Sequence, residues 1–220
     1  MTEQLEQSRP RSWSYSSLSD YETCAHAWMY RRIIKLPEPA SVHLIKGNMI
    51  HKIAEDYLNG EIDELPPVLA NFSKEFANLR NRGAKAEEAL CIDEYWRLIP
   101  DGWEHPDTWL RAKTDARIDN IIIDFKTGKQ YDSHVTQAQL YADLFLATTS
   151  EYDEVHTEFW YLESGAVSDW TFTRDGLPDR IKDWKLRANA MLTDTTFLPT
   201  KHKWCKYCYV KKQCPIFQKK

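Results

Sequence analysis

The sequence predicts an α/β fold, because segments with strand-like and helix-like spacing of apolar residues alternate along the chain. Strand patterns cover residues 109–118 and 121–126, and two further alternating stretches follow at 154–165 and 167–174. Helical periodicity marks residues 48–60, 68–80, 135–149 and 178–194, and a stretch beginning at residue 85 predicts the first strand of the sheet. The 220 residues, 42% of them hydrophobic, are enough for one domain with a packed core.

Composition narrows the possible functions. The net charge of −4 excludes a globally basic nucleic-acid binder, although a local basic groove remains compatible with it. We expect no membrane segment and no export signal, because no apolar run approaches spanning length. The five cysteines are therefore expected in a reducing, cytoplasmic setting, where they bind metal more often than they form disulfides.

Residues 109–129 (WLRAKTDARIDNIIIDFKTGK) carry the strongest local signal. In a strand over 121–126, alternation separates a core-facing set (Ile121, Ile123, Phe125) from a second face with Ile122, Asp124 and Lys126. A buried strand tolerates an aspartate and a lysine poorly unless they are paired or bind a ligand. This face is therefore a candidate functional site.

The preceding strand places a second aspartate beside the first. If Asp119 and Asn120 form the turn, Ile118 pairs with Ile121, and counting back sets Asp115 opposite Asp124. Opposed side chains have Cβ atoms about 5 Å apart, so two carboxylates would repel unless a cation lies between them. Magnesium or manganese suits such oxygen ligands, and the alternative is a surface hairpin with solvated charges.

An aspartate on one strand and Asp-x-Lys on the next resemble the PD-(D/E)xK nuclease superfamily. The resemblance implies that Asp115 and Asp124 hold Mg²⁺ or Mn²⁺ and that Lys126 positions or polarises the attacking water. The stretch GNMIH resembles the Gly-x-x-x-His element of RecB-type nucleases, which makes His51 a further metal ligand. Gln137 and Tyr141 match the Gln-x-x-x-Tyr that follows the lysine strand in that family. Glu88 and Glu94 are further acids that could approach the metal, and the sequence does not say which of them does so, if either.

The N-terminal segment predicts a helix starting at Ser17, where Ser17 and Asp20 form a capping box, and continuing through Cys24 to Met29. At the other end of the chain, Cys205, Cys208 and Cys214 form C-x2-C-x5-C. One early cysteine with this C-terminal pattern resembles the iron–sulfur RecB-type nucleases, which include CRISPR-associated adaptation nucleases and the nuclease domain of AddAB-type helicase–nucleases. The resemblance implies a [4Fe-4S] cluster held by Cys24, Cys205, Cys208 and Cys214, and structural zinc is the alternative.

Together these features predict one nuclease domain over residues 1–220. Its restriction-endonuclease-like core, a mixed central sheet flanked by helices, would occupy about residues 84–175, and a helical cysteine-cluster lobe would combine about 12–60 with 195–220. The implied function is metal-dependent DNA hydrolysis, as an exonuclease on single-stranded or free ends, with a protein partner in recombination, repair or CRISPR adaptation. The alternative is a non-catalytic DNA-binding or assembly module with a vestigial nuclease fold and structural zinc.

Overall fold

The computed structural model describes residues 8–39 and 41–218. The chain divides into two compact units, one formed by residues 1–39 and 181–220 and the other by residues 40–180. We call them the terminal unit and the central unit. Within the described ranges, no helix combines the length and apolar character needed to cross a membrane.

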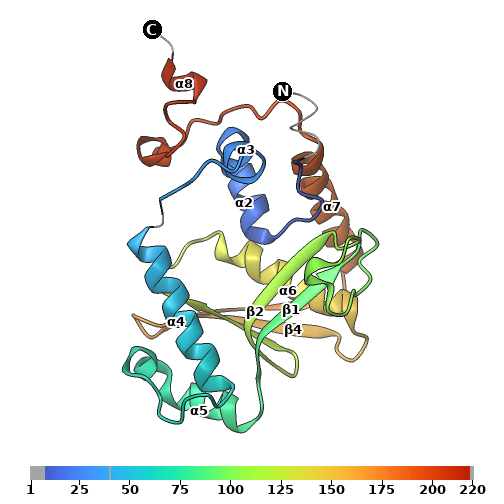
Figure 1. Ribbon diagram of the computed structural model, residues 1–220. Coiled ribbons are helices and arrows are strands. Elements are labelled where there is room, and N and C mark those ends of the chain that lie inside the picture. The colour runs from blue at the N-terminus through green and yellow to red at the C-terminus, as the bar shows by residue number, and fades with distance from the viewer. Residues whose placement is uncertain (1–7, 40, 219–220) are drawn as a thin grey trace. The chain divides into compact units, whose positions relative to one another are not determined.

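The central unit is built on a five-stranded sheet with strand order β1-β2-β3-β4-β5 (Figure 1). The strands are β1 (Lys85–Ile92), β2 (Leu110–Ile118), β3 (Ile121–Lys126), β4 (Glu154–Tyr161) and β5 (Ala166–Thr173). Only β3 and β4 pair in parallel, because helix α6 (His134–Thr148) carries the chain back between them. The predicted α/β class with a mixed sheet is confirmed.

The β2–β3 hairpin has the register expected from its alternating pattern. Ile118 pairs with Ile121, and the next two pairs are Arg117 with Ile122 and Ala116 with Ile123. The two-residue turn is closed by Asp119, whose φ of 49° lies in the left-handed region. The ladder between these strands ends at Ala116 and Ile123, although both strands continue beyond it.

Each face of the sheet has its own hydrophobic core. On one face, α4 (Val42–Leu58), η1 (Pro67–Phe72) and α5 (Ser73–Asn81) pack against Ile123 and Phe125. Phe125 lies 5.0 Å from Phe76, and Phe72 stacks on Trp160 at 4.9 Å, measured between ring centroids. On the other face, Ala138 of α6 packs with aromatic residues of β4 and β5. The sheet is therefore anchored on both sides, which fixes the strand that carries Asp124 and Lys126.

The terminal unit contains α2 (Tyr15–Thr23), α3 (Ala25–Arg32), most of α7 (Leu177–Thr193), η3 (Lys203–Tyr207) and α8 (Pro215–Gln218) (Figure 1). The predicted single helix from Ser17 was wrong in two respects. Ser14 caps α2 by accepting a hydrogen bond from the backbone N–H of Ser17, and Cys24 interrupts the helix in an extended conformation with φ −164° and ψ 103°. Cys24 both ends α2 and precedes α3.

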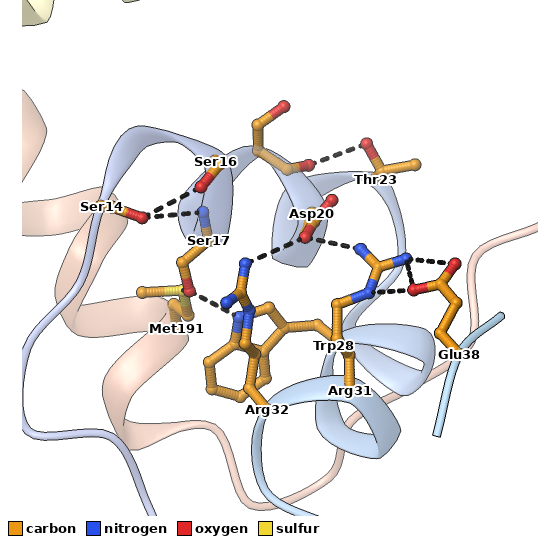
Figure 2. Close-up of polar contacts among 11 residues, drawn as sticks. Ser14, Ser16, Ser17, Asp20, Thr23, Trp28, Arg31, Arg32, Glu38 and Met191 are labelled. Carbon is orange, nitrogen blue, oxygen red and sulfur yellow. Dashed lines mark hydrogen bonds and ion pairs between the residues drawn. The ribbon is translucent and has the colours of Figure 1, made fainter. Parts of the chain in front are cut away.

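A buried aromatic core and a charged network hold the terminal unit together. The Trp28 indole donates a 2.9 Å hydrogen bond to Ser17 Oγ and stacks on Phe197 at 6.0 Å. Figure 2 shows the Arg31 guanidinium between two carboxylates, 2.6 Å from Asp20 and 2.9 Å from Glu38. These contacts tie the start of α2, the end of α3 and the following loop around Cys24.

Candidate active site

The candidate site lies where β2 and β3 part. The residues next in register beyond the ladder are Asp115 and Asp124, one on each strand. From this point β2 continues to pair with β1, and β3 continues to pair with β4. The backbone N–H of Phe125 therefore has no backbone partner on β2. It donates a 2.6 Å hydrogen bond to the side chain of Asp115, at Oδ2, instead. This fork separates the strands and orients the first carboxylate.

His51 reaches the same place from α4. Its Nδ1 lies 2.8 Å from Asp115 Oδ1, so the two side chains form a hydrogen-bonded pair. Burial acts to lower the pKa of His51, but the hydrogen bond and negative charge of Asp115 outweigh it, and the net shift is upward. Gly47, one helical turn earlier, brings α4 close to the end of β3: an added Cβ would lie 3.3 Å from Thr127 Oγ1.

Asp124 and Lys126 form a second polar group beneath α6. Asp124 is 5% exposed, and its Oδ2 lies 2.6 Å from Lys126 Nζ, an ion pair without the alignment of a hydrogen bond. Burial raises the pKa of Asp124 to about 6; the charge of Lys126 opposes this shift and that of Asp115 adds to it. An acid so placed is typical of functional sites.

Gln137 connects this pair to α6. Its Oε1 accepts a 2.9 Å hydrogen bond from Lys126 Nζ, while its Nε2 donates to Tyr141 Oη at 2.8 Å and to Asp124 Oδ1 at 3.3 Å. Burial raises the pKa of Tyr141 well above its usual value, so its hydroxyl remains protonated at neutral pH. The structure thus brings Gln137 and Tyr141, which share one side of α6, next to Asp124 and Lys126.

Glu87 is the acidic residue that the sequence did not single out. Ligand atoms of His51, Glu87 and Asp115 all lie within 4.8 Å of one another, and within the described ranges this is the one such group of three. Glu88, by contrast, accepts hydrogen bonds from the guanidinium of Arg117, with which it forms an ion pair. Alternation in a regular strand would not reveal this choice, because the backbone at Glu87 is left-handed, with φ 53°.

A cavity of about 520 Å³ opens beside this group. Its wall is formed by one side of α4 together with the acids, and its lining includes His43, Gly47, His51, Glu87, Asp115 and Thr127. A larger groove of about 850 Å³ shares His43 and Thr127 with it, so the two hollows adjoin. The groove follows the segment after β3, including Lys129 and Tyr131.

The donor set fits a hard divalent cation. Carboxylate oxygens suit Mg²⁺ and Mn²⁺, and a neutral imidazole nitrogen is also a ligand for Mn²⁺. Three such groups converge on an open cavity, and the buried carboxylate of Asp124 lies close by, paired with Lys126. Carboxylates in this arrangement can hold a cation and a lysine in position. A cation held in this way can activate water for phosphodiester hydrolysis.

Four of the five cysteines belong to the terminal unit and lie near one another: Cys24, Cys205, Cys208 and Cys214. Burial raises the pKa of Cys208, and the neighbouring charges of Cys24, Cys205 and Cys214 raise it further. Cys24 and Cys208 line a cavity of about 210 Å³, and the backbone N–H of His202 donates to Cys205 Sγ at 3.3 Å. Cys91 belongs to the central unit, where it is 2% exposed.

No curated protein matches the sequence. Among solved structures, "Crystal structure of SSO0001" is similar with 18% identity and a TM-score of 0.47, over 99% of this chain and 94% of that chain. Residues 12–215 match the family model described as "PD-(D/E)XK nuclease superfamily". Because that match covers most of the 220 residues, the chain belongs to the PD-(D/E)XK nuclease superfamily.

Proposed function

We propose that the protein is a Mg²⁺- or Mn²⁺-dependent deoxyribonuclease that acts as an exonuclease on single-stranded ends. The observation that carries this proposal is the convergence of His51 and Asp115 with the Asp124–Lys126 pair at the open end of the β2–β3 fork. His51, Asp115 and Asp124 would hold the cation. When bound, the cation would lower the pKa of a water molecule and neutralise charge on the phosphate.

The remaining side chains position the reacting groups. Lys126, held at 2.9 Å by Gln137 Oε1, places an ammonium group where it can orient water or stabilise the negative oxygens of the transition state. Tyr141 keeps Gln137 in place through its hydroxyl. Asp115 is fixed at both oxygens, by His51 and by the N–H of Phe125, so its orientation does not depend on the substrate.

The adjoining groove supports a single-stranded substrate. Tyr131 lines it with 56% of its surface exposed, and Lys129 lies two residues before it. Exposed rings stack on bases that are free of a complementary strand, and lysines neutralise the phosphates. In the terminal unit, basic and aromatic residues also alternate from Lys201 to Lys212, with Trp204 53% and Tyr207 72% exposed.

The four clustered cysteines support a [4Fe-4S] cluster with a structural role. In such a cluster each of the four thiolates would bind its own iron, whereas structural zinc, the alternative, would bind all four to one ion. Such a centre requires a reducing compartment, for which we propose the cytoplasm.

The family resemblance also suggests the biological setting. We place the proposed activity in recombination, repair or CRISPR adaptation, where DNA ends are trimmed together with a protein partner.

A cleavage assay with labelled DNA tests the proposal. Linear single-stranded, linear double-stranded and circular single-stranded DNA are incubated with the full chain and Mn²⁺, with EDTA and the Asp124→Asn variant as controls. We expect stepwise shortening of the linear single strand and no cutting of the circle. Cutting of the circle would contradict exonuclease action, and absence of any cleavage by well-folded, metal-loaded protein would contradict the nuclease assignment.

A further inference from the structure

We infer that Glu87 is a ligand of the active-site cation and that Lys113 is its counter-ion when the cation is absent. The inference deepens the proposed function, because it concerns the same site. It rests on the position of Glu87, on the charged groups around it and on the greater exposure of Lys113 compared with Lys126. Neither residue belongs to the motifs by which the family is recognised.

The position of Glu87 follows from the β1–β2 register. Ala86 pairs with Ala116 and Glu88 with Thr114, so Glu87 stands opposite Asp115. Its carboxylate and that of Asp115 come within 4.8 Å of each other and of the His51 ring nitrogen. All three line the cavity of about 520 Å³, which leaves space for a cation and its water molecules.

Two carboxylates at this separation require positive charge nearby. The side chains of Glu87 and Asp115 are only 17% and 12% exposed, so water screens their repulsion incompletely. In the chain itself, Lys113 forms an ion pair with Glu87, and His51 is hydrogen-bonded to Asp115. A divalent cation between the two carboxylates would supply this charge and replace the contact of Lys113 with Glu87.

The side chain of Lys113 is free to move away from Glu87. Its side chain is 47% exposed, so the ammonium can move into solvent at little cost when a cation takes the carboxylate of Glu87. Lys126 differs in this respect, because its side chain is 19% exposed and bonded to Gln137. The two lysines therefore have separate roles, one as an exchangeable counter-ion and the other as a fixed part of the proposed catalytic group.

Mn²⁺ binding to the full chain tests the inference without relying on activity. The loss of the free Mn²⁺ electron paramagnetic resonance signal gives the dissociation constant. We expect Glu87→Gln to raise this constant at least about tenfold. We expect Lys113→Met to lower it about threefold, because a competing positive charge is removed. Opposite effects from the two halves of one ion pair would not result from a general loss of structure.

Matched variants control for charge and folding. Glu94→Gln and Lys85→Met remove one exposed charge each in the same region and should bind Mn²⁺ as the wild type does. Glu87→Gly is a second test variant, because glycine adopts φ 53° without strain, so the fold is retained while the carboxylate is lost. It should show the same weakened binding as Glu87→Gln.

The outcomes separate this inference from the proposed function. Wild-type affinity in both Glu87 variants, with DNA cleavage retained, would overturn the role of Glu87 and leave the nuclease proposal intact. Unchanged affinity in Lys113→Met would overturn the counter-ion role. Wild-type protein that neither binds Mn²⁺ nor cleaves DNA would contradict the proposed function and this inference with it.

Discussion

The carboxylate of Asp115 accepts a 2.6 Å hydrogen bond from the backbone N–H of Phe125, the residue between Asp124 and Lys126. A side chain of β2 thus takes the place of a backbone partner for β3. The bond sets the position of Asp115 relative to both residues of the Asp-x-Lys strand. The geometry of the site is therefore determined by the backbone as well as by side-chain packing.

Lys126→Ala should abolish most DNA cleavage while leaving the protein folded. Loss of a positioned group that assists proton transfer or stabilises developing charge lowers rates by about 10²- to 10⁴-fold. The measurement is the single-turnover cleavage rate of labelled single-stranded DNA with Mn²⁺, alongside the circular dichroism spectrum. Lys85→Met, which removes an exposed lysine of β1, serves as the control. A folded Lys126→Ala protein that cuts at the wild-type rate would remove Lys126 from the catalytic group.

Asp124→Asn should stabilise the metal-free protein at neutral and alkaline pH. Burial raises the pKa of Asp124 to about 6, above its value of 3.8 in an unfolded chain, so ionising it costs folding free energy. A difference of about 2 pKa units corresponds to at most about 3 kcal/mol. The advantage of the variant should be largest above pH 6 and disappear as the pH falls towards 4.

Urea unfolding of both proteins in EDTA at several pH values measures this difference. Other titrating groups are common to the two proteins, so the gap between their unfolding free energies isolates Asp124 to a first approximation. A gap that does not change between pH 4 and pH 8 would show that Asp124 ionises as easily in the folded chain as in the unfolded one.

Cys24→Ser should destabilise the protein about as much as Cys208→Ser, although the two residues lie at opposite ends of the sequence. A centre that binds Cys24 and Cys205, the first cysteine of the C-terminal group, would close a loop of 205 − 24 = 181 residues. By analogy with disulfide loops, this closure contributes about 5 kcal/mol. Both variants should lose iron and acid-labile sulfide after anaerobic purification and melt at a lower temperature than the wild type.

Cys91→Ala is the matched control, because Cys91 is buried in the central unit, whereas the other four cysteines belong to the terminal unit. It should keep full iron content and lose only the stability expected from a small change in the core. Colourless wild-type protein with stoichiometric zinc would replace the cluster with a zinc site. Full metal content and an unchanged melting temperature in Cys24→Ser would show that Cys24 is not a ligand.

The effect of Gly47→Ala on the free energy of unfolding should depend on Thr127. Alanine favours the interior of α4 by about 1 kcal/mol over glycine, but its Cβ would lie 3.3 Å from Thr127 Oγ1. We expect little net change in the wild-type background and a gain of about 0.5–1 kcal/mol in Thr127→Ala. Chemical unfolding of the four proteins gives the coupling, and equal effects in both backgrounds would show that the contact is unimportant.

The sequence predicts the β2–β3 hairpin well, because strict alternation and a two-residue turn leave one register that buries Ile123 and Phe125. From that register the approach of Asp115 to Asp124 follows directly. Helical spacing likewise predicts that Gln137 and Tyr141 share one side of α6. These are local patterns, and local patterns are what a sequence displays most clearly.

Glu87 and Cys24 could not be located in the same way. Glu87 depends on a left-handed backbone inside a strand, where no glycine or asparagine signals it. Cys24 interrupts a helix without a proline or glycine beside it, so the helical periodicity appears continuous across the break. In both cases tertiary contacts determine the backbone, and the sequence alone contains no local sign of them.

The open fork has a consequence for when the site can form during synthesis. The hairpin is local in sequence, but β2 and β3 stay apart only if β1 holds one strand and β4 holds the other. Strand β4 begins at Glu154, after the whole of α6 has been made. A ribosome-bound chain that ends before β4 therefore has no strand to pair with β3 on the side away from β2. The proposed nuclease activity would be absent until β4 has been synthesised and pairs with β3.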